Sequence, residues 1–204
     1  MAAARSSPVP AVPGQAPAAA AGSAGALGGA GGLASAEPLS GDGLYLCTNK
    51  YEDQVVQRVA LPTGQAFLIS HGADSWLTSE GESLEEEDLQ KLERAFRDSH
   101  FLDFPEHVHT TGPAEREWDL RFASRDRGHQ ALSFQEPSPP FRDVFAACER
   151  AFSRLPTTRS EDASAALAIY RALEEYAQAL KRPDPRRQML LEWLDSLQAE
   201  LPGQ

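Results

Sequence analysis

Hydrophobic and polar residues alternate in two neighbouring segments in the second half of the chain, 117–123 and 129–135. The apolar positions are Trp118, Leu120, Phe122, Leu132 and Phe134. Alternation with a period of two is typical of a β-strand that buries one face. The segment 124–128 between them is rich in turn-forming residues. The pattern therefore predicts a β-hairpin whose other face is solvated.

A second pair of strands is predicted nearer the N-terminus, at 54–61 and 65–71, around the turn signal Pro62-Thr63-Gly64. A short strand at 44–48 is expected to precede it. Gly72, Ser79 and Gly81 then favour a loop, with the side chains at 76 and 77 folded back onto the core.

Apolar residues spaced three and four apart predict four helices. The first is expected from Ser83 to about His100, with Ser83 and Glu86 at capping-box spacing. The second carries a stripe of apolar residues between positions 141 and 155. The third runs from about 161 to 181. The fourth begins at Pro185 with Asp184 as its cap.

The short connection between the last two helices predicts an antiparallel helical hairpin. This hairpin either packs on the core or serves as a docking element. The fold class expected is α+β: an antiparallel sheet of two β-hairpins in the order ββαββα, packed with helices, plus the C-terminal α-helical hairpin.

Composition divides the chain into three parts. Residues 1–43 are mostly Ala, Gly, Pro and Ser and are expected to form a disordered tail, because they lack the apolar side chains that a core requires. Residues 44–156 are expected to form the α+β domain and 157–204 the helical hairpin. Deletion of 1–43 is therefore expected to leave the melting temperature unchanged.

The net charge is −11, from 19 Lys and Arg against 30 Asp and Glu. Binding to nucleic acid or to an anionic membrane requires clustered bases, so both are disfavoured. No stretch is long and apolar enough for a transmembrane helix. The acidic balance fits either solubility or a basic protein partner. No motif for a cofactor is found, and the oligomeric state is left open.

Two charged clusters are candidates for binding a partner protein: Glu85, Glu86, Glu87 and Asp88, and Arg182, Arg186 and Arg187. The acidic residues also suit the positive end of a helix dipole, which is a purely structural explanation. Two arginines at a helix start do not suit that dipole, so Arg186 and Arg187 are expected to pair with Glu174 and Glu175 or to contact an acidic partner.

A catalytic or metal site is not predicted, but one alternative remains. His107 and His109, with His100 and Glu115 nearby, have the chemistry of zinc ligands, although structural zinc requires four ligands. Cys47 and Cys148 lie in apolar runs and are expected to be buried free thiols. A disulfide is the alternative if the compartment is oxidising.

The N-terminal segment bears on localisation. It resembles a signal peptide only in part, because Arg5 is its one early base and Gly dilutes its apolar run. A cytoplasmic location is therefore expected, with secretion or a periplasmic location after cleavage near Ala34-Ser35-Ala36 as the alternative.

The segment from 55 to 155 contains a hairpin, the helix SLEEEDLQKLERAFRDSHFLDFP, a second hairpin and PPFRDVFAACERAF. This order resembles emfourin-type bacterial inhibitors of M4 metalloproteases. The resemblance implies a small acidic domain that occludes a peptidase active site. The glycine-rich start of that family is missing and the tail and helical hairpin are additional, so no functional residue is transferred.

These observations favour a non-enzymatic protein-binding module, such as an inhibitor, an adaptor or an immunity-like protein. A secretion-type chaperone would instead be a dimer with a hydrophobic strip. A metal-dependent enzyme that uses the His107/His109 loop would bring His100 and Glu115 to the same point.

Overall fold

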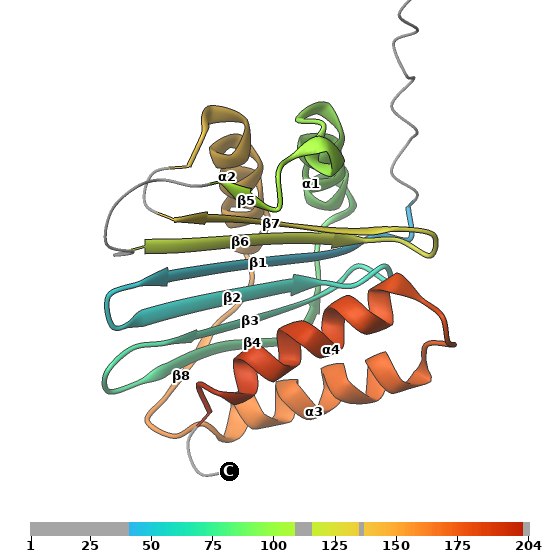
Figure 1. Cartoon of the computed structure of the whole chain (residues 1–204). Coiled ribbons are helices and arrows are strands. Elements are labelled where there is room, and N and C mark those ends of the chain that lie inside the picture. The colour runs from blue at the N-terminus through green and yellow to red at the C-terminus, as the bar shows by residue number, and fades with distance from the viewer. Residues whose placement is uncertain (1–40, 109–115, 135–136, 202–204) are drawn as a thin grey trace, which may run out of the picture. The chain divides into compact units, whose positions relative to one another are not determined.

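The computed structural model describes residues 41–108, 116–134 and 137–201. The expected tail therefore lies outside the described residues, except for Gly41, Asp42 and Gly43. All described residues belong to one compact unit. The fold is α+β, as predicted, and consists of a sheet with two helices on each face (Figure 1).

The sheet has eight strands in the order β5-β7-β6-β1-β2-β3-β4-β8. Neighbouring strands are antiparallel, except that the edge strand β5 pairs in parallel with β7. The strands are β1 Leu44–Tyr51, β2 Gln54–Ala60, β3 Gln65–His71, β4 Trp76–Ser83, β5 His107–Val108, β6 Arg116–Ala123, β7 Gly128–Phe134 and β8 Thr158–Ser160. The central β1 pairs with β2 on one side and β6 on the other, so each of its faces lies deep in the core.

Four α-helices cover the sheet: α1 Glu86–Asp98, α2 Pro139–Phe152, α3 Ser164–Ala179 and α4 Pro185–Gln198. A short 3₁₀ turn, Phe101–Asp103, follows α1. Figure 1 shows α1 and α2 over one face and α3 and α4 over the other. Alternate residues of β1 divide between two cores: Tyr45 and Cys47 face α1 and α2, whereas Leu44 and Leu46 face α3 and α4.

The predicted order ββαββα does not occur in the structure. Four strands, β1 to β4, precede α1. The segment expected to be a loop forms β4. Its glycine is accommodated by a bulge, since Ser79 and Glu82 pair with Leu68 and Ala66 and leave two residues opposite one. Gly81 lies in that bulge with a φ of 64°, a conformation that favours glycine.

The predicted capping box is also absent. Ser83 is the last residue of β4, and α1 begins only at Glu86, after Glu85. Glu85 makes no side-chain capping bond.

The apolar stripe of α2 is confirmed, with Phe141, Val144, Phe145, Cys148 and Phe152 all buried. The predicted cap of α4 is confirmed too, because Asp184 Oδ1 accepts a hydrogen bond from the Arg186 amide at 2.9 Å.

The hairpin of β6 and β7 is confirmed, but its predicted solvated face is not. Asp119 and Arg121 lie on that face and are only 6% and 8% exposed. The Arg121 guanidinium donates to Asp119 Oδ2 at 2.7 and 2.9 Å, and the Gln130 amide donates to both oxygens. Mutual pairing allows these charges to be buried beneath a helical layer that the local pattern does not reveal.

The C-terminal hairpin of α3 and α4 packs on the sheet rather than extending away from it. Leu173, Leu190, Trp193 and Leu197 are at most 1% exposed. The short β8 joins the edge of β4 just before α3. The expected boundary at residue 156 therefore lies within a structure whose sheet continues past it.

Candidate functional site

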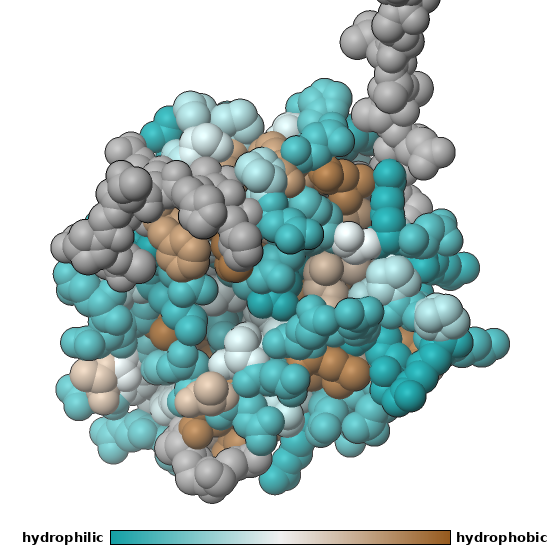
Figure 2. Space-filling view, in the orientation of Figure 1, coloured by the Kyte–Doolittle hydropathy of each residue, from teal (hydrophilic) through white to brown (hydrophobic). Residues whose placement is uncertain are grey.

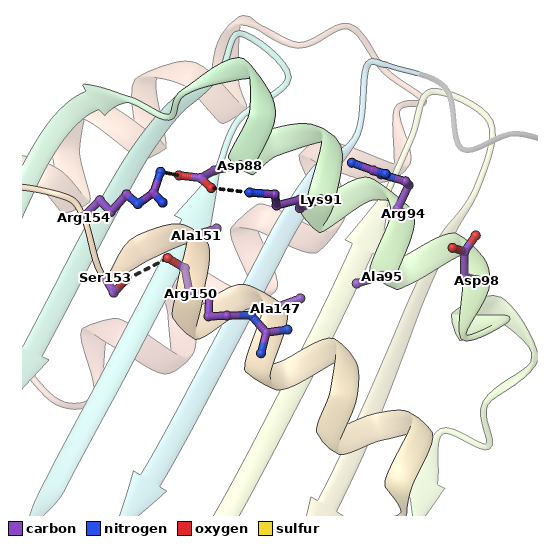
Figure 3. Close-up of a pocket in the computed structure, with 10 residues that line it drawn as sticks. All are labelled: Asp88, Lys91, Arg94, Ala95, Asp98, Ala147, Arg150, Ala151, Ser153 and Arg154. Atoms are coloured by element: carbon purple, nitrogen blue, oxygen red, sulfur yellow. Dashed lines mark hydrogen bonds and ion pairs between the residues drawn. The ribbon is translucent and has the colours of Figure 1, made fainter.

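A groove of about 560 Å³ lies between α1 and α2, on the side of these helices away from the sheet (Figure 3). Three alanines line it: Ala95 of α1, and Ala147 and Ala151 of α2. The apolar stripes of both helices point into the core, so small side chains occupy the positions where the helices approach each other.

At one end of the groove, the carboxylate of Asp88 contacts two basic side chains. It is only 6% exposed and accepts a hydrogen bond from Arg154 Nη1 at 3.2 Å. Lys91 Nζ lies 3.8 Å from its other oxygen, as Figure 3 shows. Arg154 also donates to Glu85 at 3.1 Å. The start of α1 is thus tied to the end of α2, and the charge of Asp88 is compensated within the chain.

Two further arginines, Arg94 and Arg150, line the groove without forming an ion pair among the described residues. Arg94 Nε donates to the carbonyl oxygen of Gln90 at 3.3 Å, which does not neutralise the guanidinium. Within the described residues, no carboxylate forms an ion pair with Arg94 or Arg150. Asp98 lies 3.3 Å from Arg97 Nε instead.

The lining of the groove is therefore basic in an acidic protein. Four bases, Lys91, Arg94, Arg150 and Arg154, face two acids, Asp88 and Asp98. Both acids have partners within the chain. The six charged side chains that line the groove thus sum to a charge of +2, four bases minus two acids, although the net charge of the chain is −11.

The acidic residues predicted to bind a partner lie at the start of α1, beside this groove. Glu85 and Asp88 contact Arg154. Glu87 lies 2.8 Å from Lys91 Nζ, and the hydrogen bond from this ammonium lowers the pKa of Glu87. Glu86 accepts a hydrogen bond from Gln90. All four carboxylates therefore have partners within the chain.

The predicted basic residues lie on the other face of the sheet, around the start of α4, and the structure does not bring them near the acidic cluster. Arg182 is exposed. Arg186 is only 7% exposed and donates to both carboxylate oxygens of Asp184, at 3.0 and 2.7 Å, and to the carbonyl of Asp42. This pairing lowers the pKa of Asp184. Arg187 is half-buried.

The histidine loop considered for a metal is largely beyond what the structure describes. His109 and Glu115 lie outside the described residues, and only the backbone of His107 is described. The His100 Nδ1 atom lies 3.8 Å from Asp103. Among the described residues, no group of three His, Cys, Asp or Glu side chains is placed to hold a metal ion.

Cys47 of β1 and Cys148 of α2 are free thiols in the core. Burial, and to a smaller extent the neighbouring Cys47, raises the pKa of the Cys148 thiol well above its ordinary value. A protonated, buried thiol is a poor nucleophile.

Exposed apolar surface is sparse on the described part of the chain. Tyr51 and Leu77 are the large hydrophobic side chains more than a third exposed there, at 37% and 36%. Figure 2 shows a mostly hydrophilic face with hydrophobic residues in separate small areas. No helix of the described residues is long and apolar enough to cross a membrane. The groove is thus the better candidate for a binding site.

The groove residues Arg94, Arg150 and Arg154 were not singled out by the sequence. The available signal was spacing, since Lys91 and Arg94 are three residues apart on one side of α1, while Arg150 and Arg154 lie in the last turn of α2 and just after it. The sequence does not show that these two helices are neighbours. A scan of protein-family models and a search of curated proteins found no match to this chain.

Proposed function

We propose that this chain is a non-enzymatic protein-binding module that receives a segment of its partner in the groove between α1 and α2. The observation that carries the proposal is the combination of an open, alanine-lined groove with two arginines, Arg94 and Arg150, that have no carboxylate partner among the described residues. Such a groove offers van der Waals contact to a polypeptide backbone and directional hydrogen bonds to its side chains.

The rigidity of the groove supports this role. Its two walls are helices anchored in one core through Leu92, Phe96, Val144 and Cys148. The ion pairs of Arg154 with Glu85 and Asp88 join the walls at one end. A preformed groove loses little conformational entropy when it binds, which favours affinity.

The test is site-specific photo-crosslinking in cells that make the protein. A photoreactive residue at position 95, in the groove, should crosslink to one partner protein. The same residue at position 171, which is exposed on α3, is the matched control and should not. Ala147→Trp, which fills the groove, should abolish the crosslink. Equal crosslinking from both positions, or none from position 95, would overturn the proposal.

A further inference from the structure

The charge of the groove points to the chemistry of its occupant. Lys91 and Arg94 line the α1 side, and Arg150 and Arg154 line the α2 side. Asp88 already compensates part of the charge of Lys91 and Arg154. Arg94 and Arg150, on opposite walls, form no ion pair with a carboxylate among the described residues.

The shape of the site distinguishes a polypeptide from a single small anion. A phosphate is held tightly when several donors converge on one point. Here the bases are spread along the groove: Lys91 and Arg94 lie on α1 with their Cβ atoms about 5–6 Å apart, Arg150 lies in the last turn of α2, and Arg154 lies just beyond its end. This arrangement matches successive carboxylates along a chain. The three alanines between the walls leave room for the backbone that carries them.

We infer that the groove binds an acidic peptide segment of the partner protein, with carboxylates paired to Arg94 and Arg150. This inference rests on the proposed function. Arginine suits the task because its planar guanidinium forms two parallel hydrogen bonds to one carboxylate. The acidic character of the rest of the surface, with a net charge of −11, disfavours a long polyanion such as nucleic acid but not a short segment held in a groove lined by more bases than acids.

The experiment titrates the full chain with three fluorescent peptides of about 15 residues, long enough for either a helical or an extended conformation. The three share an alanine-rich frame and carry Glu, Gln or Lys at the same spaced positions. The protein variants are Arg94→Gln with Arg150→Gln, and the control Arg171→Gln. All three arginines are exposed, so the variants should retain the melting temperature of the parent.

The expected result is binding of the Glu peptide alone, weakened about tenfold or more in the groove variant and unchanged in the control. Binding should also weaken as salt rises from about 0.05 to about 0.5 M, because the Debye length shortens. Equal binding of the three peptides, no binding of the Glu peptide, or equal losses in both variants would overturn the inference.

Inorganic phosphate is titrated in parallel. If phosphate binds through Arg94 and Arg150 and the Glu peptide does not, the site takes a small anion and the inference fails. The experiments distinguish failure of the acidic-peptide inference from failure of the proposed protein-binding function. A crosslink from position 95 without preference for the Glu peptide retains the groove as a protein-binding site and rejects its acidic occupant, whereas no crosslink rejects the protein-binding function itself.

Discussion

The indole Nε1–H of Trp193 donates a hydrogen bond to Thr48 Oγ1 at 3.1 Å, in the core between α4 and the central strand β1. Trp193 is 1% exposed and Thr48 is 6% exposed. The contact joins residues 145 positions apart. The C-terminal hairpin is therefore part of the structural core and not a removable arm.

Thr48→Val tests this contact. Valine has nearly the shape of threonine but leaves the indole N–H without its acceptor, so the free energy of unfolding should fall by about 1–3 kcal/mol. Chemical denaturation measures the change. In a background of Trp193→Phe, which has no N–H, the same substitution should cost less. Equal losses in both backgrounds would show that the hydrogen bond contributes nothing.

Tyr45 differs from Trp193 in that its buried polar group is not hydrogen-bonded to any described residue. Its hydroxyl is buried without a hydrogen-bond partner among the described residues, while its ring contacts Phe96 and Phe122. Burial raises the pKa of this phenol. Tyr45→Phe should keep the ring contacts, remove the unsatisfied oxygen and stabilise the protein by about 1 kcal/mol. Tyr51→Phe, at an exposed position, is the control, and a loss of stability in Tyr45→Phe alone would reveal an unrecognised partner.

The start of the folded region should lie two or three residues earlier than composition indicates. Asp42 accepts from Arg186 through its carbonyl, and its carboxylate lies 2.9 Å from Arg125 Nε. A chain that begins at residue 44 should therefore melt about 3 °C below one that begins at 41, from the loss of about 1 kcal/mol of partly exposed contacts. Equal melting temperatures, measured by calorimetry, would restore the boundary at 43.

His71 should make stability depend on pH. Its side chain is 16% exposed and lies against the Trp76 ring. Desolvation lowers its pKa below 6.5, although Glu200, with its carboxylate 3.7 Å away, acts in the opposite direction. Between the folded pKa and 6.5 the unfolded chain binds more protons, so the free energy of unfolding should rise with pH.

The stability due to neutral His71 is thus complete above 6.5 and is lost as pH falls through the folded pKa. His71→Gln should flatten the curve of unfolding free energy between about pH 5 and about pH 7. Glu200→Gln should steepen it, because the group that raises the pKa is removed. A wild-type curve that falls with rising pH in this range would contradict the assignment.

The sequence predicted those helices, strands and caps that are specified by residues close together along the chain. The stripe from Phe141 to Phe152 and the hairpin of β6 and β7 are examples, since each rests on a long, regular repeat of apolar positions. The cap at Asp184 was predictable because it involves the amide only two residues later.

The features that the sequence did not predict depend on contacts between segments that are distant along the chain. β4 was missed because Gly72 and Gly81 favour turns, whereas pairing with β3 and a bulge overrode that local preference. Asp119 and Arg121 resemble solvent-facing residues, but they are buried in a strand, β6, that α4 contacts. For the same reason, nothing local indicated that Arg94 and Arg150 face a common groove.

Binding of an acidic peptide in the groove between α1 and α2 can be mapped on the protein by NMR of the backbone amides during a titration with the Glu peptide. If the groove binds the peptide, the amides of residues 88–98 and 147–154 should shift on its addition, while those of α3 and α4 should not. Shifts confined to α3 and α4, or absent from the groove at saturation, would contradict binding in the groove.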